Sequence, residues 1–279
     1  MSATTEKMTV IASDPTSVRT VERAGVKSVK GCTALGLSKA HNVFVLSSAT
    51  DLPSVSQFVR EANRAHKLRA LFVRQDVDLP FFATMLYRAD VRTLRNLVVH
   101  SGTDIPHRMI FAWSVGAQDQ LIAAANVTAD RLFVLSCANE QLEVPFDAIS
   151  GLAKITVNER GEFEIAKDGS YIHWPKLDIH LDLDEIRCAT DPQWRAEVAA
   201  QSIEYDTNFG KAVAALRKDL GLRQSDIENL SERQVGRIER GSRPRLDSLK
   251  KLAKTHEMKI NEYLEAIARK VHEVSTETP

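Results

Sequence analysis

The chain has 279 residues, of which 43% are apolar and 27% charged, and its formal net charge at pH 7 is zero. This length exceeds the usual size of one domain, so we expect at least two domains with cores of their own. The composition is typical of a soluble globular protein. No apolar run approaches the roughly 18 residues of a membrane-spanning helix, which excludes a membrane protein.

The N-terminal stretch "MSATTEKMTVIASDPTSV" lacks the charged and then apolar layout of a secretory signal, and its Ser and Thr content predicts a flexible tail over residues 1–20. We therefore expect a cytoplasmic protein. The three cysteines, Cys32, Cys137 and Cys188, are odd in number and far apart. Because no CxxC pair is present, they indicate neither a disulfide framework nor a zinc site.

The zero net charge hides an asymmetry between the two ends of the chain. Residues 208–272 hold 15 Lys and Arg against 9 Asp and Glu, whereas residues 1–207 hold 22 against 26. A basic module attached to an acidic remainder of the chain is typical of a protein in which one domain binds a polyanion.

Residues 21–107 are expected to form an α/β unit. Apolar runs of strand length alternate with helical periodicity: strands over 41–48, 68–74 and 97–101, a helix over 54–67, and a second, bent or interrupted helix over 78–96. This order suggests a partly parallel sheet. The turns between strands and helices carry no glycine pattern, so no phosphate-binding loop is predicted.

Residues 108–195 are expected to form a small α+β domain. The runs "RMIFAWSV", "DRLFVLSC" and "QLEVPF" are interpreted as strands, and "CANEQ" joins the last two as a hairpin. Asp147 is expected to open a short helix, and Asp168 and Gly169 to supply the positive φ angles of a tight turn in "FEIAKDGSYIHWP". The stretch "DLDEIRC" predicts a short acidic helix.

The order of these segments resembles a small uncharacterised bacterial domain family over about residues 120–188. The hairpin "DRLFVLSCANEQLEVPF" and the stretch "EFEIAKDGSYIHWPKLDIHLDLDEI", followed by a helical module, carry the resemblance. It implies an α+β module of unknown function, often placed before a DNA-binding domain or encoded beside toxin and antitoxin genes, and it implies no catalysis.

After a linker over 196–207, residues 208–272 show strong helical periodicity, and a short tail, 273–279, follows. A first helix is expected to end at Gly221, a second to begin at Gln224 and a third to be capped by Ser231, with Pro244 closing the next loop. The apolar stripes of the first, fourth and fifth helices are Phe209, Val213, Leu216 and Leu220; Leu246, Leu249, Leu252 and Ala253; and Ile260, Tyr263, Leu264 and Ile267. The pattern predicts an all-α bundle of five short helices.

This module resembles the lambda-repressor-like, Cro/Xre-type helix-turn-helix family on "LRKDLGLRQ", "RQVGRIERG" and "LKKLAKTHEMKINEYL". The resemblance implies that Gln224 contacts a DNA phosphate, that the helix from Ser231 enters the major groove, and that Arg217 and Glu239 form a structural ion pair. The chain departs from the family by a spacing about three residues shorter between Gln224 and Glu239. We therefore expect helix two over 225–229, with Asn229 turning the chain where the family has glycine.

The segment "SERQVGRIERG" predicts a helix with two kinds of position. Val235 and Ile238 are expected to point inward, and the exposed residues are expected to meet base edges. The alternative is a solvated charged helix, which the surrounding order of helices and caps disfavours. The expected base readers are Arg233, Gln234 and Arg237. The expected phosphate contacts are Gln224, Ser231, Arg243 and Arg245, with Lys211 or Arg223 as weaker candidates.

Signals for catalysis or metal binding are absent from the sequence. Neither His100 with His107 nor His173 with His180 stands in an HExxH motif or a Cys/His cluster, so structural or surface histidines are expected. No nucleophile elbow or phosphate-binding loop is present. We expect no cofactor, no metal and no enzymatic activity.

The sequence favours a sequence-specific transcriptional regulator, in particular a repressor. A single module contacts few phosphates, so we expect a homodimer that reads two half-sites of a double-stranded operator. The N-terminal region would then serve dimerisation or bind a protein partner or small-molecule effector. Two alternatives remain open: an antitoxin that neutralises a toxin and represses their shared operon, and an enzyme tethered to DNA.

Overall fold

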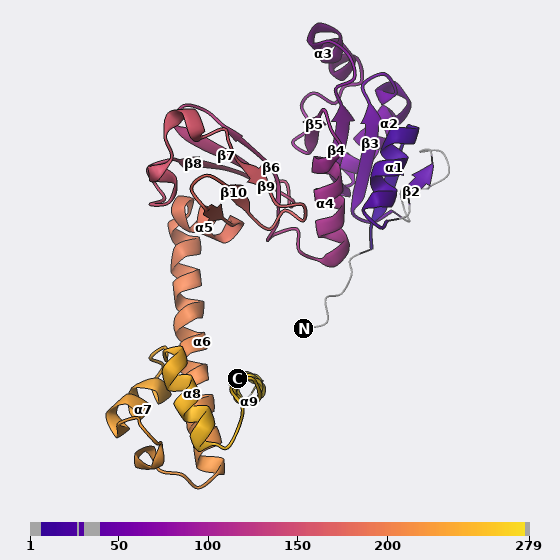
Figure 1. Ribbon diagram of the computed structural model, residues 1–279. Coiled ribbons are helices and arrows are strands. Elements are labelled where there is room, and N and C mark those ends of the chain that lie inside the picture. Colours follow the sequence, from indigo (N-terminus) through magenta and orange to yellow (C-terminus); the bar gives the residue numbers. More distant parts are fainter. Residues whose placement is uncertain (1–6, 27, 31–39, 277–279) are drawn as a thin grey trace. The chain divides into compact units, whose positions relative to one another are not determined.

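The structure is a computed structural model that describes residues 7–26, 28–30 and 40–276 (Figure 1). The chain folds into two compact units, Met1–Asp191 and Pro192–Pro279. It is mixed α and β, with one parallel sheet, two small antiparallel sheets and a C-terminal helical region. None of the helices within the described residues combines the length and the apolar character that a bilayer crossing requires.

The N-terminal unit begins with a five-stranded parallel sheet in the order β2-β1-β3-β4-β5. Strands and helices alternate along the chain as β1 (Thr9–Ala12), α1 (Pro15–Arg23), β2 (Ser28–Lys30), β3 (Val43–Ser48), α2 (Leu52–Arg64), β4 (Leu68–Arg74), α3 (Leu79–Arg88), β5 (Leu97–His100) and α4 (Asp104–Val115). The three predicted strands and the helix predicted over 54–67 are thus confirmed. The helix predicted over 78–96 is confirmed only in part, because α3 ends at Arg88 and the chain makes turns from there to β5.

Helices cover both faces of this sheet, which explains why its central strands are continuous apolar runs. On one face, Val43, Val45 and Leu71 pack with side chains of α2 and α3. On the other face, Phe44 and Phe72 pack with side chains of α1 and α4. All six residues of β3 are buried, as expected for a strand enclosed on both sides.

Two predictions for this region are wrong. The expected flexible tail contains β1 and α1, because Asp14 caps α1 through the amides of Thr16 and Ser17, while β1 pairs with both β2 and β3. The stretch "RMIFAWSV" is the body of helix α4 and not a strand. A short apolar run does not distinguish a strand from a buried helix, and here Met109 and Ile110 face the sheet from a helix that Gly116 ends in the left-handed conformation.

A small antiparallel module completes the N-terminal unit. Its elements are β6 (Ile122–Val127), β7 (Arg131–Ser136), β8 (Gln141–Pro145), the 3-10 turns η3 (Leu152–Lys154) and η4 (Val157–Glu159), β9 (Glu164–Ile165), β10 (Ile172–Trp174), β11 (Ile179–Leu181) and α5 (Leu183–Thr190). They form two three-stranded sheets, β6-β7-β8 and β11-β10-β9. The inner faces of both sheets and α5 share one core, which includes Phe146, Trp174 and Ile186.

The hairpin of β7 and β8 and the acidic helix α5 are confirmed, and Asp182 caps α5 through the amide of Glu185. The turn between β9 and β10 contains Gly169 at φ 82°, as predicted, although Asp168 does not share the positive φ. The helix expected after Asp147 is wrong. The chain makes turns there and then only the short 3-10 turn η3, since Gly151 interrupts the segment.

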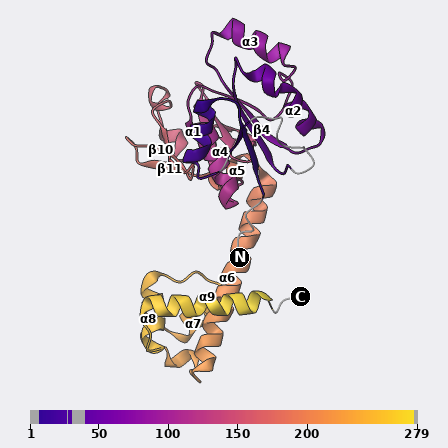
Figure 2. The ribbon, with the colours of Figure 1, turned by 90° about the vertical axis from the view of Figure 1, so that its right-hand side faces the viewer.

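The C-terminal unit consists of α6 (Pro192–Asp219), the 3-10 turn η5 (Gln224–Asp226), α7 (Glu232–Glu239), α8 (Leu246–Thr255) and α9 (Ile260–Thr276). Figure 2 shows α7, α8 and α9 gathered around the C-terminal half of α6. Their shared core contains Val213, Val235, Leu252, Tyr263 and Ile267.

The linker predicted over residues 196–207 is instead part of the continuous helix α6, because this stretch contains three alanines and two glutamates, which favour helix, and no glycine or proline. The predicted second helix is reduced to the 3-10 turn η5, and Asn229, at φ 61°, turns the chain as expected. Gly221 follows the end of α6 at φ 69°. Three predicted core residues at helix ends or edges are exposed, namely Leu220, Leu246 and Leu264.

Gly210 marks the closest approach of α6 to the C-terminal end of α7. A Cβ atom at this position would lie 2.6 Å from the carbonyl oxygens of both Ile238 and Glu239. Glycine within a helix costs about 1 kcal/mol relative to alanine. The helix has glycine at this position despite the cost, because only a residue without a side chain allows the two backbones to approach so closely.

We therefore expect Gly210→Ala to destabilise the C-terminal unit by about 1–3 kcal/mol, despite the higher helix propensity of alanine. Calorimetric unfolding of the full chain measures the effect. Lys211→Ala, at an exposed neighbouring position of α6, is the matched control and should change stability by less than about 0.5 kcal/mol. A Gly210→Ala variant as stable as the original chain would contradict this account of the helix contact.

Candidate nucleic-acid interface

Helix α7 begins with a reciprocal pair of hydrogen bonds, a capping box. The Ser231 hydroxyl accepts from the Gln234 amide at 3.3 Å, while the Gln234 side-chain oxygen accepts from the Ser231 amide at 2.9 Å. The Ser231 hydroxyl also donates to that oxygen at 3.0 Å. These bonds satisfy amides that the first helical turn leaves without partners, and so they fix where α7 starts.

The inner face of α7 holds the helix against the rest of the unit. Val235 and Ile238 are buried, as the sequence predicts, and both belong to the core of the C-terminal unit. Gly236 is buried between them, and a Cβ there would lie 3.3 Å from side-chain atoms of both Gln224 and Arg240. The inner face therefore has a fixed position and orientation.

A buried ion pair holds the C-terminal end of α7. Arg217 of α6 donates from Nε to Glu239 Oε1 at 2.6 Å and from Nη2 to Oε2 at 3.1 Å, and each side chain is 9% exposed. Gln224 of η5 donates to Glu239 Oε2 at 2.5 Å, and Arg217 Nη1 donates to the carbonyl of Leu222 at 2.6 Å. The ion pair implied by the resemblance is present, and it connects α6, η5 and α7.

Both partners of this pair are charged. Burial raises the pKa of Glu239, but hydrogen bonds from Arg217 and Gln224 and the positive charge of Arg217 outweigh it and hold the pKa below its ordinary value. The hydrogen bond to Glu239 raises the pKa of Arg217 in turn. The pair is a bidentate, charge-assisted contact of the kind that fixes geometry.

The outer face of α7 is a stripe of three arginines. Arg233, Arg237 and Arg240 are exposed and follow the spacing i, i+4, i+7, which places them on one side of a helix. The first two are expected base readers. Arg240, the C-cap residue of α7, was not among the predicted site residues, although its spacing from Arg233 would have indicated it.

Other predicted contacts are engaged within the protein. The side-chain oxygen of Gln234 belongs to the capping box, so the paired donor and acceptor that recognise adenine are not both available in this arrangement. The hydroxyl of Ser231 and the amide of Gln224 are likewise hydrogen-bonded inside the unit. The expected contacts of these three side chains with DNA therefore require that they leave their present partners.

A surface hollow of about 460 Å³ lies beside α7 and is lined by Leu230, Gln234, Arg237, Ile238, Arg243, Pro244, Arg245, Asp247, Ser248 and Lys251. Four cations and one carboxylate face it. Among the predicted site residues, the hollow brings together Gln234, Arg237, Arg243 and Arg245. Gln224, Ser231 and Arg233 do not line it, and Lys251 was missed because its place depends on the packing of α8.

Two of the cations in the hollow form ion pairs with carboxylates, of which Asp206 is half-buried and Asp247 is exposed. Arg243 Nε lies 2.7 Å from Asp206 Oδ2, and its guanidinium also donates to the Ser202 hydroxyl. Lys251 Nζ lies 2.7 Å from Asp247 Oδ2. Arg243 is 69% exposed, and surface pairs of this kind contribute only about 0–1 kcal/mol. Both cations can therefore exchange these partners for an external anion at little cost.

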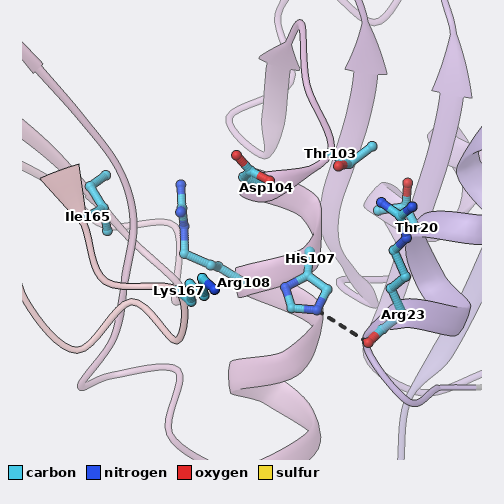
Figure 3. Close-up of a pocket in the computed structure, with 8 residues that line it drawn as sticks. All are labelled: Thr20, Arg23, Thr103, Asp104, His107, Arg108, Ile165 and Lys167. Atoms are coloured by element: carbon cyan, nitrogen blue, oxygen red, sulfur yellow. Dashed lines mark hydrogen bonds between the residues drawn. The ribbon is translucent and has the colours of Figure 1, made fainter.

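The N-terminal unit holds a separate pocket of about 400 Å³ (Figure 3), lined by Thr20, Arg23, Thr103, Asp104, His107, Arg108, Ile165 and Lys167. His107 Nε2 lies 3.3 Å from the carbonyl oxygen of Arg23. Arg108 donates from Nε to the carbonyl of Ala123, and burial lowers its pKa. Among the described residues, none of the pocket's three cations, Arg23, Arg108 and Lys167, forms an ion pair.

Burial raises the pKa of the Cys137 thiol to about 12, which keeps this cysteine protonated and unreactive at neutral pH. Cys188 is half-buried, whereas Cys32 lies outside the described residues. The positive charge of Arg108, a residue of the pocket, only partly opposes the effect of burial on the pKa of Cys137.

Comparison with known proteins gives one match. Residues 122–188 match a family described as "Protein of unknown function (DUF2442)". The matched segment runs from β6 to α5 and coincides closely with residues 120–188, where the sequence resembles an uncharacterised bacterial family. No curated protein and no solved structure matches the chain.

The lowered pKa of Glu239 gives the C-terminal unit a defined pH dependence. Its contribution to stability is fully present above the ordinary carboxyl pKa of about 4.3 and is lost as pH falls through the lower, folded-state pKa. Glu239→Gln leaves Arg217 buried without its anion, which costs about 3–5 kcal/mol at pH 7. Urea unfolding of both chains should show that this difference shrinks towards pH 3, and a constant difference would contradict the ion-pair account.

Proposed function

We propose that the protein is a sequence-specific regulator that binds double-stranded DNA through its C-terminal unit and represses transcription. The observation that carries the proposal is the outer face of α7, where three exposed arginines stand beside a hollow that four cations line. A rigid helix with a cationic outer face suits the major groove, which admits one α-helix. The excess of basic residues over 208–272 supports the same assignment.

In this proposal the residues of the interface have separate roles. Arg233 and Arg237 read base edges, because arginine can donate two hydrogen bonds to O6 and N7 of guanine. Arg240, at the end of the same stripe, contributes a third guanidinium. Arg243 and Arg245 contact phosphates, which position the helix and supply affinity without reading sequence.

We further propose that the protein binds its operator as a homodimer. A single module of this size buries less surface than a specific complex with DNA commonly does, about 1,000–2,500 Å². Two modules that read half-sites about one helical turn apart overcome this limit.

Replacing one reader and one phosphate contact tests the DNA proposal. Operator duplexes are first selected from a random pool with the full-length protein. Arg237→Ala should then lower affinity for the selected duplex about 5- to 150-fold, the equivalent of about 1–3 kcal/mol per bidentate contact. Arg243→Ala should weaken binding to all duplexes and reduce the salt slope by about one.

Arg269→Ala is the matched control, since Arg269 is an exposed arginine of α9 that does not line the hollow. It should leave both affinity and salt slope nearly unchanged. Gel-shift titrations at several salt concentrations measure all three variants. If Arg237→Ala and Arg243→Ala both bind the selected duplex as tightly as the original chain, α7 is not the reading helix.

The pocket of Figure 3 supports a role of the N-terminal unit in binding an effector, and we propose a small anion as its ligand. Arg108 is partly buried, and the one carboxylate that lines the pocket, Asp104, interacts with it electrostatically without forming an ion pair. Lys167 and Arg23 line the same pocket, whose volume of about 400 Å³ suits a small metabolite. A bound carboxylate or phosphate would compensate the excess of three cations over one carboxylate in this pocket.

Thermal unfolding with inorganic phosphate and with citrate tests the effector proposal. At least one of the two anions should raise the unfolding temperature of the full-length protein, because binding to the folded state stabilises it. Lys167→Ala should weaken that stabilisation several-fold, whereas Lys154→Ala, at an exposed lysine outside the pocket, should not. Equal stabilisation of both variants, or none of the original chain, would contradict the proposal.

A further inference from the structure

The outer face of the sheet β11-β10-β9 gathers two histidines. Side chains alternate along a strand, and in β10 the flanking residues Ile172 and Trp174 are buried, so His173 points to the opposite, outer face. In β11, Leu181 is buried and His180 is exposed in the same way. The antiparallel register pairs His173 directly with His180, which places both imidazoles side by side on that face.

The turn between these strands adds a carboxylate. Asp178 has φ 50°, a left-handed conformation that reverses the chain just before β11. Its Oδ1 lies 3.7 Å from His173 Nε2 and 3.9 Å from His180 Nδ1. One ligand atom from each of the three residues lies within 4.8 Å of the others. His173 Nε2 is shielded from solvent and makes no hydrogen bond within the described residues.

We propose that His173, Asp178 and His180 form a binding site for a divalent transition metal ion, with Zn²⁺ as its principal ligand. Two imidazole nitrogens and one carboxylate oxygen are a donor set that suits Zn²⁺, Cu²⁺ and Ni²⁺, whereas Ca²⁺ and Mg²⁺ require mostly oxygen ligands. Three protein ligands leave at least one coordination position for water. Neither the proposed DNA interface nor the anion pocket includes any of these residues.

The site requires only a small contraction to enclose an ion. Zinc bonds of about 2.0–2.1 Å in a tetrahedral site put neighbouring ligand atoms about 3.3 Å apart, compared with 3.7 and 3.9 Å here. The two imidazoles stack at 4.1 Å between centroids, so the rings rotate out of the stack when their in-plane lone pairs turn towards the metal. His180 and Asp178 are 48% and 89% exposed, which leaves room for this rotation.

The neighbouring strand contributes a second carboxylate to the same face. Glu164 of β9 is the register partner of His173, so its exposed side chain points to the outer face beside the triad. Tyr171, two residues before His173, also lies on this face, and its ring centroid is 5.0 Å from that of His180. The two carboxylates beside the two imidazoles favour a bound cation.

Titration calorimetry of the full-length, untagged protein with ZnCl₂ after chelator treatment tests the proposal. We expect one Zn²⁺ per chain, and with Cu²⁺ an electron paramagnetic resonance spectrum that shows two nitrogen ligands. His180→Ala and Asp178→Asn should each weaken binding at least tenfold. Both replace exposed side chains, and circular dichroism verifies that the variants are folded.

His41→Ala is the matched control, because His41 is an exposed histidine of the same unit that lies outside the triad. It should bind Zn²⁺ as the original chain does. The proposal is overturned if the original chain binds no Zn²⁺, if His180→Ala and Asp178→Asn bind it with unchanged affinity, or if His41→Ala weakens binding as much as they do. None of these outcomes bears on DNA binding, which depends on the other unit.

Discussion

The arrangement of the C-terminal unit depends on the buried contact between Arg217 and Glu239. Helix α7 has only eight residues, and a helix of that length is unstable in isolation because nucleation is costly. Its first turn is held by the capping box and its last turn by the ion pair, to which Gln224 adds a third hydrogen bond. Since removal of either charge would leave the other buried and unpaired, α7 keeps one orientation whenever the unit is folded. This contact therefore fixes the position of the exposed arginine stripe.

Much of the fold could be predicted because local chemistry and tertiary environment agree. Central strands of a covered parallel sheet are uniformly apolar, and β3 and β4 follow that rule. Ser231 and Asn229 are residues whose side chains suit a cap and a left-handed turn. The predictions were wrong where one sequence pattern is compatible with two different secondary structures. The apolar run around Met109 fits a strand as well as a buried helix, and the polar stretch before Phe209 fits a linker as well as an exposed helix.

The candidate sites show the same contrast between residues that a local pattern places and residues that only the tertiary fold brings together. Helical periodicity was enough to place Val235 inward and Arg237 outward. The spacing Ser-x-x-Gln was a readable sign that Gln234 caps α7, and interpreting it as a base reader overlooked that sign. Lys251 lines the hollow because of the tertiary position of α8, which no local sequence pattern reveals. His173 and His180 meet only through strand register, which their separation in the sequence does not reveal.

The division of α7 into inner and outer residues also bears on how such a protein changes over evolutionary time. Its core contacts are made by Val235, Gly236 and Ile238, whereas the exposed arginines contribute nothing to that core. Replacements on the outer side are therefore nearly free of a folding penalty. If this helix reads DNA as proposed, proteins descended from one ancestral gene can acquire new target sequences through substitutions at a few exposed residues. The core of the unit then stays the same.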